Sequence, residues 1–173
     1  MYGDESDVHL NPIIGPVWHK CGERWKVAAA LQNRKVYVFG VLNVKSGRVH
    51  YRIFKRKRAV EFLEFLRWLL KRYRRWEVYL VLDNFVIHKT KKVQKFCREN
   101  QRRLKIVWLP TYSPRLNLIE RFWTYMKAHT VRNHFFGDVV KLAQALHSFF
   151  RKYHNGKIER IVFEEKHLLR KAA

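Results

Sequence analysis

Acidic residues are scarce in this chain, so the few that stand at special positions are informative. The 173 residues include 37 Lys and Arg against 14 Asp and Glu. Asp83 ends an apolar run, Glu120 opens a helical pattern, and Asp4 and Glu5 stand together near the start. Carboxylate-only sites suit Mg²⁺ or Mn²⁺, because these hard cations prefer oxygen ligands. Acids that converged from three such places would therefore form a metal site.

Each acid also has a plainer structural interpretation. Asp83 would satisfy local backbone donors in a turn after the strand. Asn117 and Glu120 have the spacing of a capping box, in which the glutamate bonds back to the start of its helix. Asp4 and Glu5 would lie in a frayed terminus. Strand alternation places Glu5 on the face opposite to Asp4, which leaves Asp4 as the better ligand of the two.

The composition limits the partners. Hydrophobic residues make up 47% of the chain, too many for a disordered polyelectrolyte, yet the formal net charge is +23. A folded domain with this much self-repulsion indicates a polyanionic partner, and nucleic acid is favoured over an anionic membrane surface. No run approaches the roughly 18 apolar residues of a membrane span, and no signal peptide opens the chain. We therefore expect a cytoplasmic, nucleoid-associated protein.

The remaining pattern predicts the elements that position the acids. Three β-rich runs within residues 24–55 predict an antiparallel meander, with a short further strand at the N-terminus. Helical spacing and apolar runs predict helices at 58–73, 89–100, 118–132 and after Asp138, and strands buried on both faces at 77–83 and 104–110. Strand–helix–strand units give parallel strands, so we expect a three-layer α/β domain with a mixed sheet.

Two segments carry a resemblance to a known family. "LVLDNFVIHK" at 80–89 and "VWLPTYSPRLNLIERFW" at 107–123, with an early "DES", resemble the catalytic core of DDE transposases of the mariner superfamily, in the insertion-sequence branch of bacteria and archaea. The resemblance covers nearly the whole chain. It implies a ribonuclease-H-like fold, with a mixed five-stranded sheet flanked by helices on both faces. It also assigns catalysis and metal binding to Asp4, Asp83 and Glu120.

The resemblance implies metal-dependent DNA strand cleavage and strand transfer during DNA transposition. The implied cofactor is a pair of Mg²⁺ or Mn²⁺ ions, one to activate water or a 3′-hydroxyl and one to stabilise the leaving oxygen. The implied partners are double-stranded DNA, as transposon ends and target, and a second copy in a homodimer. Two alternatives stay open: a catalytically inactive remnant that binds DNA non-specifically, and a structure-selective nuclease such as a junction resolvase.

Further residues are assigned supporting roles. Asn84 and His88 match the family segment and are predicted to position DNA or the acids. The predicted DNA-binding residues are Asn84, His88, Lys89, Lys91, Lys92 and Arg115. Ser113, Pro114 and Asn117 are predicted to shape the turn that delivers Glu120. Trp123 is expected to belong to the core.

The chain departs from the family pattern in two places. Leu118 stands where the family has proline, and only three residues precede Asp4. We therefore expect residues 1–173 to form a single catalytic domain without the upstream helix-turn-helix region. We also expect a short first strand and a mobile Asp4, because ladder partners would be missing.

Overall fold

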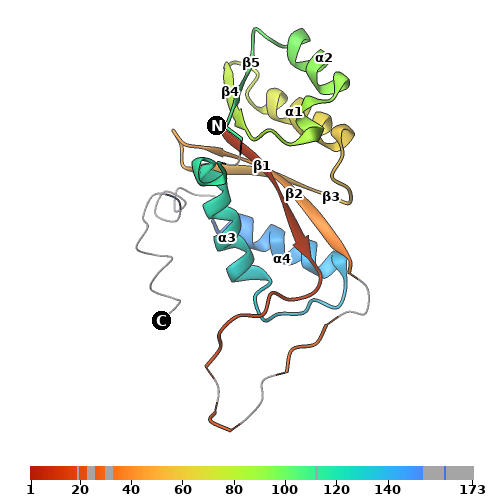
Figure 1. Cartoon of the computed structure of the whole chain (residues 1–173), viewed down its shortest axis with the longest axis vertical. Coiled ribbons are helices and arrows are strands. Elements are labelled where there is room, and N and C mark those ends of the chain that lie inside the picture. The colour runs from red at the N-terminus through yellow and green to blue at the C-terminus, as the bar shows by residue number, and fades with distance from the viewer. Residues whose placement is uncertain (19, 23–25, 30–32, 112, 154–161, 163–173) are drawn as a thin grey trace.

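A five-stranded mixed sheet forms the centre of the molecule (Figure 1). The computed structural model describes residues 1–18, 20–22, 26–29, 33–111, 113–153 and 162. The strand order is β3-β2-β1-β4-β5, with β1 in the middle. The strands are β1 (Tyr2–His9), β2 (Lys35–Asn43), β3 (Arg48–Phe54), β4 (Val78–Leu82) and β5 (Leu104–Trp108).

Helices cover both faces of the sheet, as Figure 1 shows. The helical elements are α1 (Ala59–Arg72), η1 (Val86–Lys89), α2 (Lys91–Glu99), η2 (Pro114–Leu116), α3 (Leu118–Thr130) and α4 (Val139–Lys152), where η marks a short 3₁₀ helix. The apolar faces of α1 and α2 pack with β4 and β5 in one core cluster. The apolar faces of α3 and α4 pack with β1 and β2 in a second cluster on the other side. The described part of the chain holds no helix with the length and apolarity needed to cross a bilayer.

The central strand brings two acids to the same end of the sheet. β1 pairs with β2 along its whole length, and it meets β4 in parallel at Tyr2 and Val81. There the Val81 amide donates to the Met1 carbonyl at 2.8 Å. Asp4 and Asp83 each lie two residues beyond this parallel pair, so they leave neighbouring strands on the same level. The expected short first strand is wrong, because β1 has eight paired residues.

Most of the predicted elements are confirmed. All four helices and both parallel strands lie within a few residues of their predicted bounds. The antiparallel meander is also present, but β1, β2 and β3 form it. The run predicted as its first strand is wrong where it can be checked, because residues 26–29 are not in a strand and 24, 25, 30 and 31 lie outside the described residues.

The prediction that the parallel strands are buried on both faces is wrong. Val78, Leu80 and Leu82 point toward α1 and are buried, whereas Tyr79 between them is 55% exposed. On β5, Val107 and Trp108 are also exposed. An apolar run thus indicated a strand correctly, but it did not show how many layers cover that strand.

Candidate active site

A cavity of about 360 Å³ opens beyond the carboxyl ends of β4 and β5. Asp83 enters it from the end of β4, and Glu120 enters it from the first turn of α3. The lining residues are Asp83, Asn84, Phe85, Leu109, Pro110, Thr111, Ser113, Asn117 and Glu120. The two parallel strands and α3 therefore bring two of the three predicted acids to one cavity.

Asp4 lies within electrostatic reach of both of these acids. Burial raises the pKa of Asp4 well above its usual range, and the charges of Glu120, Glu5 and Asp83 raise it further. Such mutual repulsion is relieved when a cation joins the carboxylates. The geometry thus brings Asp4, Asp83 and Glu120 to one end of the sheet.

The donor set fits a hard divalent cation. The three acids supply only oxygen ligands, and the buried Oδ1 of Asn117, beside them, has no hydrogen-bond partner. In their present positions, however, no three His, Cys, Asp or Glu side chains among the described residues are gathered closely enough to hold a metal. Glu120 and half of the Asp83 side chain are exposed, so both can turn toward a ligand.

Trp123 holds Asp4 from the α3 side of the sheet. Its indole Nε1 donates to Asp4 Oδ2 at 3.0 Å, and its ring is buried. The ring fits because Gly40 pairs with Asp4 across β1 and β2 and has no side chain: a Cβ on Gly40 would lie 2.5 Å from Trp123 Cη2. Sequence reasoning placed Trp123 in the core, which is confirmed, but it missed this bond and Gly40. A glycine inside a strand pattern was the available signal.

Glu120 does not form a capping box. Asn117 is the N-cap residue of α3, but its side chain makes no capping bond. Its Nδ2 instead donates to the Gly3 carbonyl at 3.1 Å, which ties the start of α3 to β1 beside Asp4. The Glu120 side chain is therefore left to line the cavity. This arrangement favours the functional interpretation of Glu120 over the structural one.

The turn after β4 combines a local bond with a longer-range one. The Phe85 amide donates to Asp83 Oδ1 at 3.1 Å, so the turn interpretation of Asp83 is confirmed. His88 Nδ1 lies 3.2 Å from the same oxygen and also 3.2 Å from the main-chain carbonyl oxygen of Asp83, so it contacts two acceptors of this residue. The bond to His88 holds the pKa of Asp83 below its usual range, although partial burial opposes the shift. Asp83 therefore stays ionised and available to a cation.

His88 is buried between two carboxylates. Its Nε2 lies 2.9 Å from Glu5 Oε1, and its ring packs against Phe62 with centroids 4.4 Å apart. Burial alone would lower the pKa of His88, but its bonds to Asp83 and Glu5 outweigh burial and raise the pKa to about 10. Its side chain has no exposed surface, so the predicted direct DNA contact of His88 is wrong. The predicted alternative, positioning of an acid, agrees with these bonds.

The other predicted residues lie around the cavity or on the elements that flank it. Asn84 Nδ2 donates to the Leu109 carbonyl at 2.6 Å and joins the ends of β4 and β5. Ser113 lines the cavity, and Pro114 begins η2. The basic residues Lys89, Lys91, Lys92 and Arg115 are exposed on η1, α2 and η2. Their exposure is compatible with a DNA surface next to the acids.

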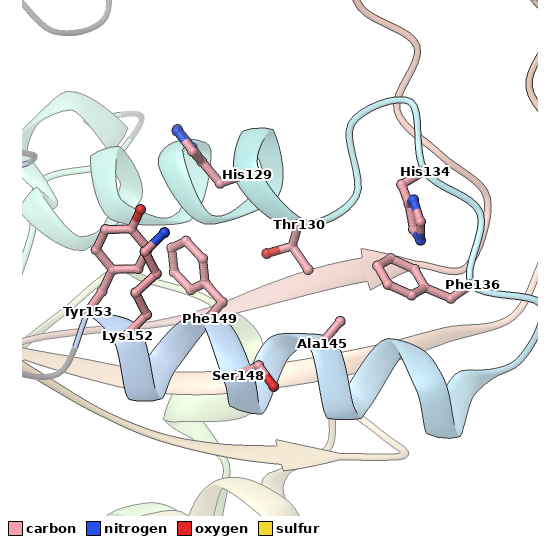
Figure 2. A pocket seen from close by; sticks show the side chains of 9 residues that line it. All are labelled: His129, Thr130, His134, Phe136, Ala145, Ser148, Phe149, Lys152 and Tyr153. Carbon is pink, nitrogen blue, oxygen red and sulfur yellow. The ribbon is translucent and has the colours of Figure 1, made fainter.

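A second kind of cavity lies on the α3–α4 side of the sheet. One of about 430 Å³ lies between α3, α4 and the segment that joins them, and His129, His134 and Lys152 are among the side chains around it (Figure 2). The residues that line it include no carboxylate. Asp83 and Glu120 thus distinguish the cavity at the ends of β4 and β5 from this one.

The order of the mixed sheet and the helices on both of its faces define a ribonuclease-H-like fold. Two solved structures of Mos1 transposase share it. The paired-end complex with the left transposon end gives a TM-score of 0.70 at 19% identity, over 99% of this chain and 53% of that chain. The isolated catalytic domain gives a TM-score of 0.63 at 16% identity, over 92% of this chain and 75% of that chain. The same catalytic domain has been solved with raltegravir and either Mn or Mg.

Sequence comparison gives the family. Residues 1–143 match the DDE superfamily endonuclease model, so the chain belongs to this family. It is 34% identical over 150 residues to an uncharacterized 39 kDa protein of insertion element IS630 from Shigella sonnei. The match covers 86% of this chain and 43% of that protein, so the chain spans less than half of this relative. The family predicted from the two motifs is confirmed.

Proposed function

We propose that the chain carries the catalytic site of a transposase, which cleaves DNA strands and transfers them during DNA transposition. The observation that carries this proposal is that Asp83 and Glu120 line one cavity and Asp4 lies within electrostatic reach of both, where burial first and then the neighbouring carboxylates raise the pKa of Asp4. Membership of the DDE endonucleases supports it. The fold shared with a transposase solved on transposon-end DNA supports it as well.

In this proposal the three acids would hold two Mg²⁺ or Mn²⁺ ions. When bound, the ions would activate water or a 3′-hydroxyl and neutralise the leaving oxygen. The chain's own residues prepare the ligands: Trp123 fixes one oxygen of Asp4, and His88 fixes one oxygen of Asp83. Glu120 stands free on the first turn of α3. Two of the three acids are thus already oriented by a side chain of another element.

The proposed partners are transposon ends and target DNA, bound as double strands, with a second copy of the chain. The net charge of +23 supports a polyanionic partner. If the exposed basic residues make about 6 to 10 phosphate contacts, DNA affinity should fall by roughly 10³ to 10⁵ between 50 and 200 mM salt. A salt slope near zero would contradict this electrostatic account of DNA binding.

Metal binding and strand cleavage test the proposal together. Mn²⁺ should be titrated calorimetrically into the wild type, Asp83→Asn and Glu120→Gln, each with a nicked DNA duplex present. The control is Glu99→Gln, which removes an exposed acid of α2 whose nearest cation, Lys95, lies 3.9 Å away. We expect Asp83→Asn and Glu120→Gln to lose Mn²⁺ binding and cleavage but to retain DNA affinity, and Glu99→Gln to behave as the wild type.

The same experiment separates the alternatives. Negligible Mn²⁺ binding by the wild type, with DNA binding retained, would identify a catalytically inactive DNA-binding remnant. Cleavage that depends on branched DNA and ignores duplex ends would identify a structure-selective nuclease. Cleavage that survives Asp83→Asn would remove this residue from the mechanism.

A further inference from the structure

We propose that Glu5 is a positioning residue of the candidate active site, which acts on Asp83 through His88. The inference rests on the proposed function, since it assumes that Asp83 is a metal ligand. Strand alternation sends Glu5 to the α1 face, away from Asp4, so Glu5 does not compete for the same place. Its role has to be sought among the groups that it touches.

The contacts form one continuous line from β1 to the end of β4. Glu5 Oε1 lies 2.9 Å from His88 Nε2, and the other ring nitrogen of His88 lies 3.2 Å from Asp83 Oδ1. The side chains of Glu5 and His88 are 3% and 0% exposed. A carboxylate buried this deeply is costly unless it is paired, so the pair has one strongly preferred arrangement.

The Glu5–His88–Asp83 contacts lie beyond the point where backbone hydrogen bonds join β1 to β4. β1 and β4 pair only at Tyr2 and Val81, and beyond that point no ladder bond fixes one strand to the other. Asp4 and Asp83 both lie beyond that point. The Glu5–His88 bond joins β1 to η1, which begins three residues after Asp83, and therefore fixes the spacing between the two acids.

Glu5→Ala tests this role, and Asp7→Ala is its matched control. Asp7 is two residues along β1, points to the same face and is also paired, with Lys35 and Lys57 at 2.9 and 2.8 Å. Mn²⁺ affinity with nicked DNA, strand cleavage and metal-free thermal unfolding should be measured for both variants. Loss of a group that orients a ligand costs about 10- to 100-fold in metal affinity or activity. We expect that loss for Glu5→Ala and an Mn²⁺ affinity within about twofold of wild type for Asp7→Ala.

A conservative variant separates positioning from folding. In Glu5→Gln the side-chain oxygen can still accept a bond from His88, so we expect most of the Mn²⁺ affinity to return. Equal losses in Glu5→Ala and Asp7→Ala, or normal Mn²⁺ affinity in Glu5→Ala, would overturn the proposal. If Asp83→Asn loses Mn²⁺ and Glu5→Ala does not, only the positioning role fails. If neither variant loses Mn²⁺, the proposed function fails.

The structure also assigns a second nucleic-acid site, at the opposite end of β4. A cavity of about 830 Å³ lies between the β2–β3 turn, the end of α1 and the start of β4. Exposed Lys45, Arg48 and Arg72 line it, together with one acid, Glu77. Glu77 pairs with Lys105 at 3.8 Å, and no carboxylate of the described residues forms an ion pair with the three cations. The ring of Trp76 in its wall is 68% exposed, and Tyr79 is exposed beside it.

The chemistry of this groove fits an unpaired DNA strand. Cations follow the phosphates of such a strand, while exposed aromatic rings stack on its bases without sequence preference. The groove includes Val78, the first residue of β4, and the acids include Asp83, which follows the last residue of this strand. A strand rises about 3.3 Å per residue, so the groove and the acids lie about 17 Å apart. A strand held there would leave the catalytic cavity free.

Tryptophan fluorescence and charge removal test the groove. Trp108 is exposed beside Lys89, so the test is made in a Trp108→Phe background. There oligo(dT) should quench Trp76, and the quenching should be lost in Trp76→Phe and kept in Trp18→Phe, which changes another exposed tryptophan. Arg48→Ala with Arg72→Ala should weaken oligo(dT) binding at least tenfold more than Lys95→Ala with Arg98→Ala, which removes two exposed charges from α2. Equal weakening by both pairs, or quenching that survives Trp76→Phe, would overturn this assignment.

Discussion

The indole of Trp123 donates a hydrogen bond to Asp4 Oδ2 at 3.0 Å, so a buried residue of α3 orients an acid of β1. The bond involves only one of the two carboxylate oxygens of Asp4. Trp123 therefore serves both the core and the candidate active site. A substitution that keeps an aromatic ring but removes the N–H donor can test the two roles separately.

Replacing Trp123 with Phe should weaken metal binding. The loss should be larger than the smaller volume of the side chain alone would cause. Phe keeps an aromatic ring but has no donor for Asp4, and a lost orienting bond costs about tenfold or more in metal affinity. Phe122→Leu is the control, because it also shrinks a buried side chain of α3, and Phe122 has no hydrogen-bonding group to lose. Mn²⁺ titration and urea unfolding of both variants check this. The role of the indole is refuted if Phe122→Leu loses as much affinity.

Gly40 should be sensitive to a single added methyl group. In Gly40→Ala the new Cβ would stand 2.5 Å from Trp123 Cη2, so the indole must move, and overpacking of this kind costs about 1–3 kcal/mol. Phe lacks the ring atoms that clash, so Gly40→Ala should cost clearly less in the Trp123→Phe background. A double-mutant cycle of unfolding free energies measures this coupling. Additive costs would mean that the two residues do not share the space.

Removing the charge of Asp4 should stabilise the metal-free protein. Burial and the neighbouring carboxylates raise the pKa of Asp4, so its ionised form destabilises the folded state at pH 7. Asp4→Asn can keep the acceptor for Trp123 and should raise the unfolding free energy by about 0.5–2 kcal/mol in EDTA. The same variant should lose the stabilisation that Mn²⁺ gives the wild type. A destabilised Asp4→Asn in EDTA would show that the acids do not repel one another.

The sequence predicted the parts of this molecule that depend on local pattern. Apolar runs and helical spacing placed β4, β5 and the four helices, and the end of β4 placed Asp83. The positions of Asp83 and Glu120 could be predicted because strand ends and helix starts are visible in one dimension, whereas Asp4 was assigned only through the resemblance to DDE transposases. The exposed face of β4 could not be predicted in this way. Tyr79 lies in an apolar run, and such a run looks the same whether or not a further layer covers the strand.

The supporting contacts of the site depend on residues far apart in the chain. Trp123 and Asp4 are separated by 119 positions, and His88 and Glu5 by 83. Periodicity says which face of an element is apolar, but it does not say which side chain of another element meets a given atom. Asn117 illustrates the same limit. Its spacing to Glu120 suggested a capping box, but its side chain donates a hydrogen bond to the Gly3 carbonyl instead.

The stability of the metal-free protein should fall as the pH rises from about 6.5 to 10, because of His88. The pKa of a histidine free of such partners is 6.5, and that of His88 in the folded protein is about 10. The folded state therefore binds the proton of His88 more tightly than the unfolded state does. The resulting stabilisation is complete below about pH 6.5 and is lost as the pH rises through 10. A shift of this size corresponds to a few kcal/mol, at 1.36 kcal/mol per pKa unit.

His88→Gln isolates this contribution from the other groups that titrate at high pH. Urea unfolding in EDTA at pH 6, 8 and 9.5 should give a free energy that falls more steeply for the wild type than for His88→Gln. The variant should be less stable at pH 6, because it leaves Glu5 buried without its cationic partner. Toward pH 10 the two curves should approach each other, since the wild-type histidine then loses its own charge. Parallel curves across this range would show that His88 is not held as a cation between Glu5 and Asp83.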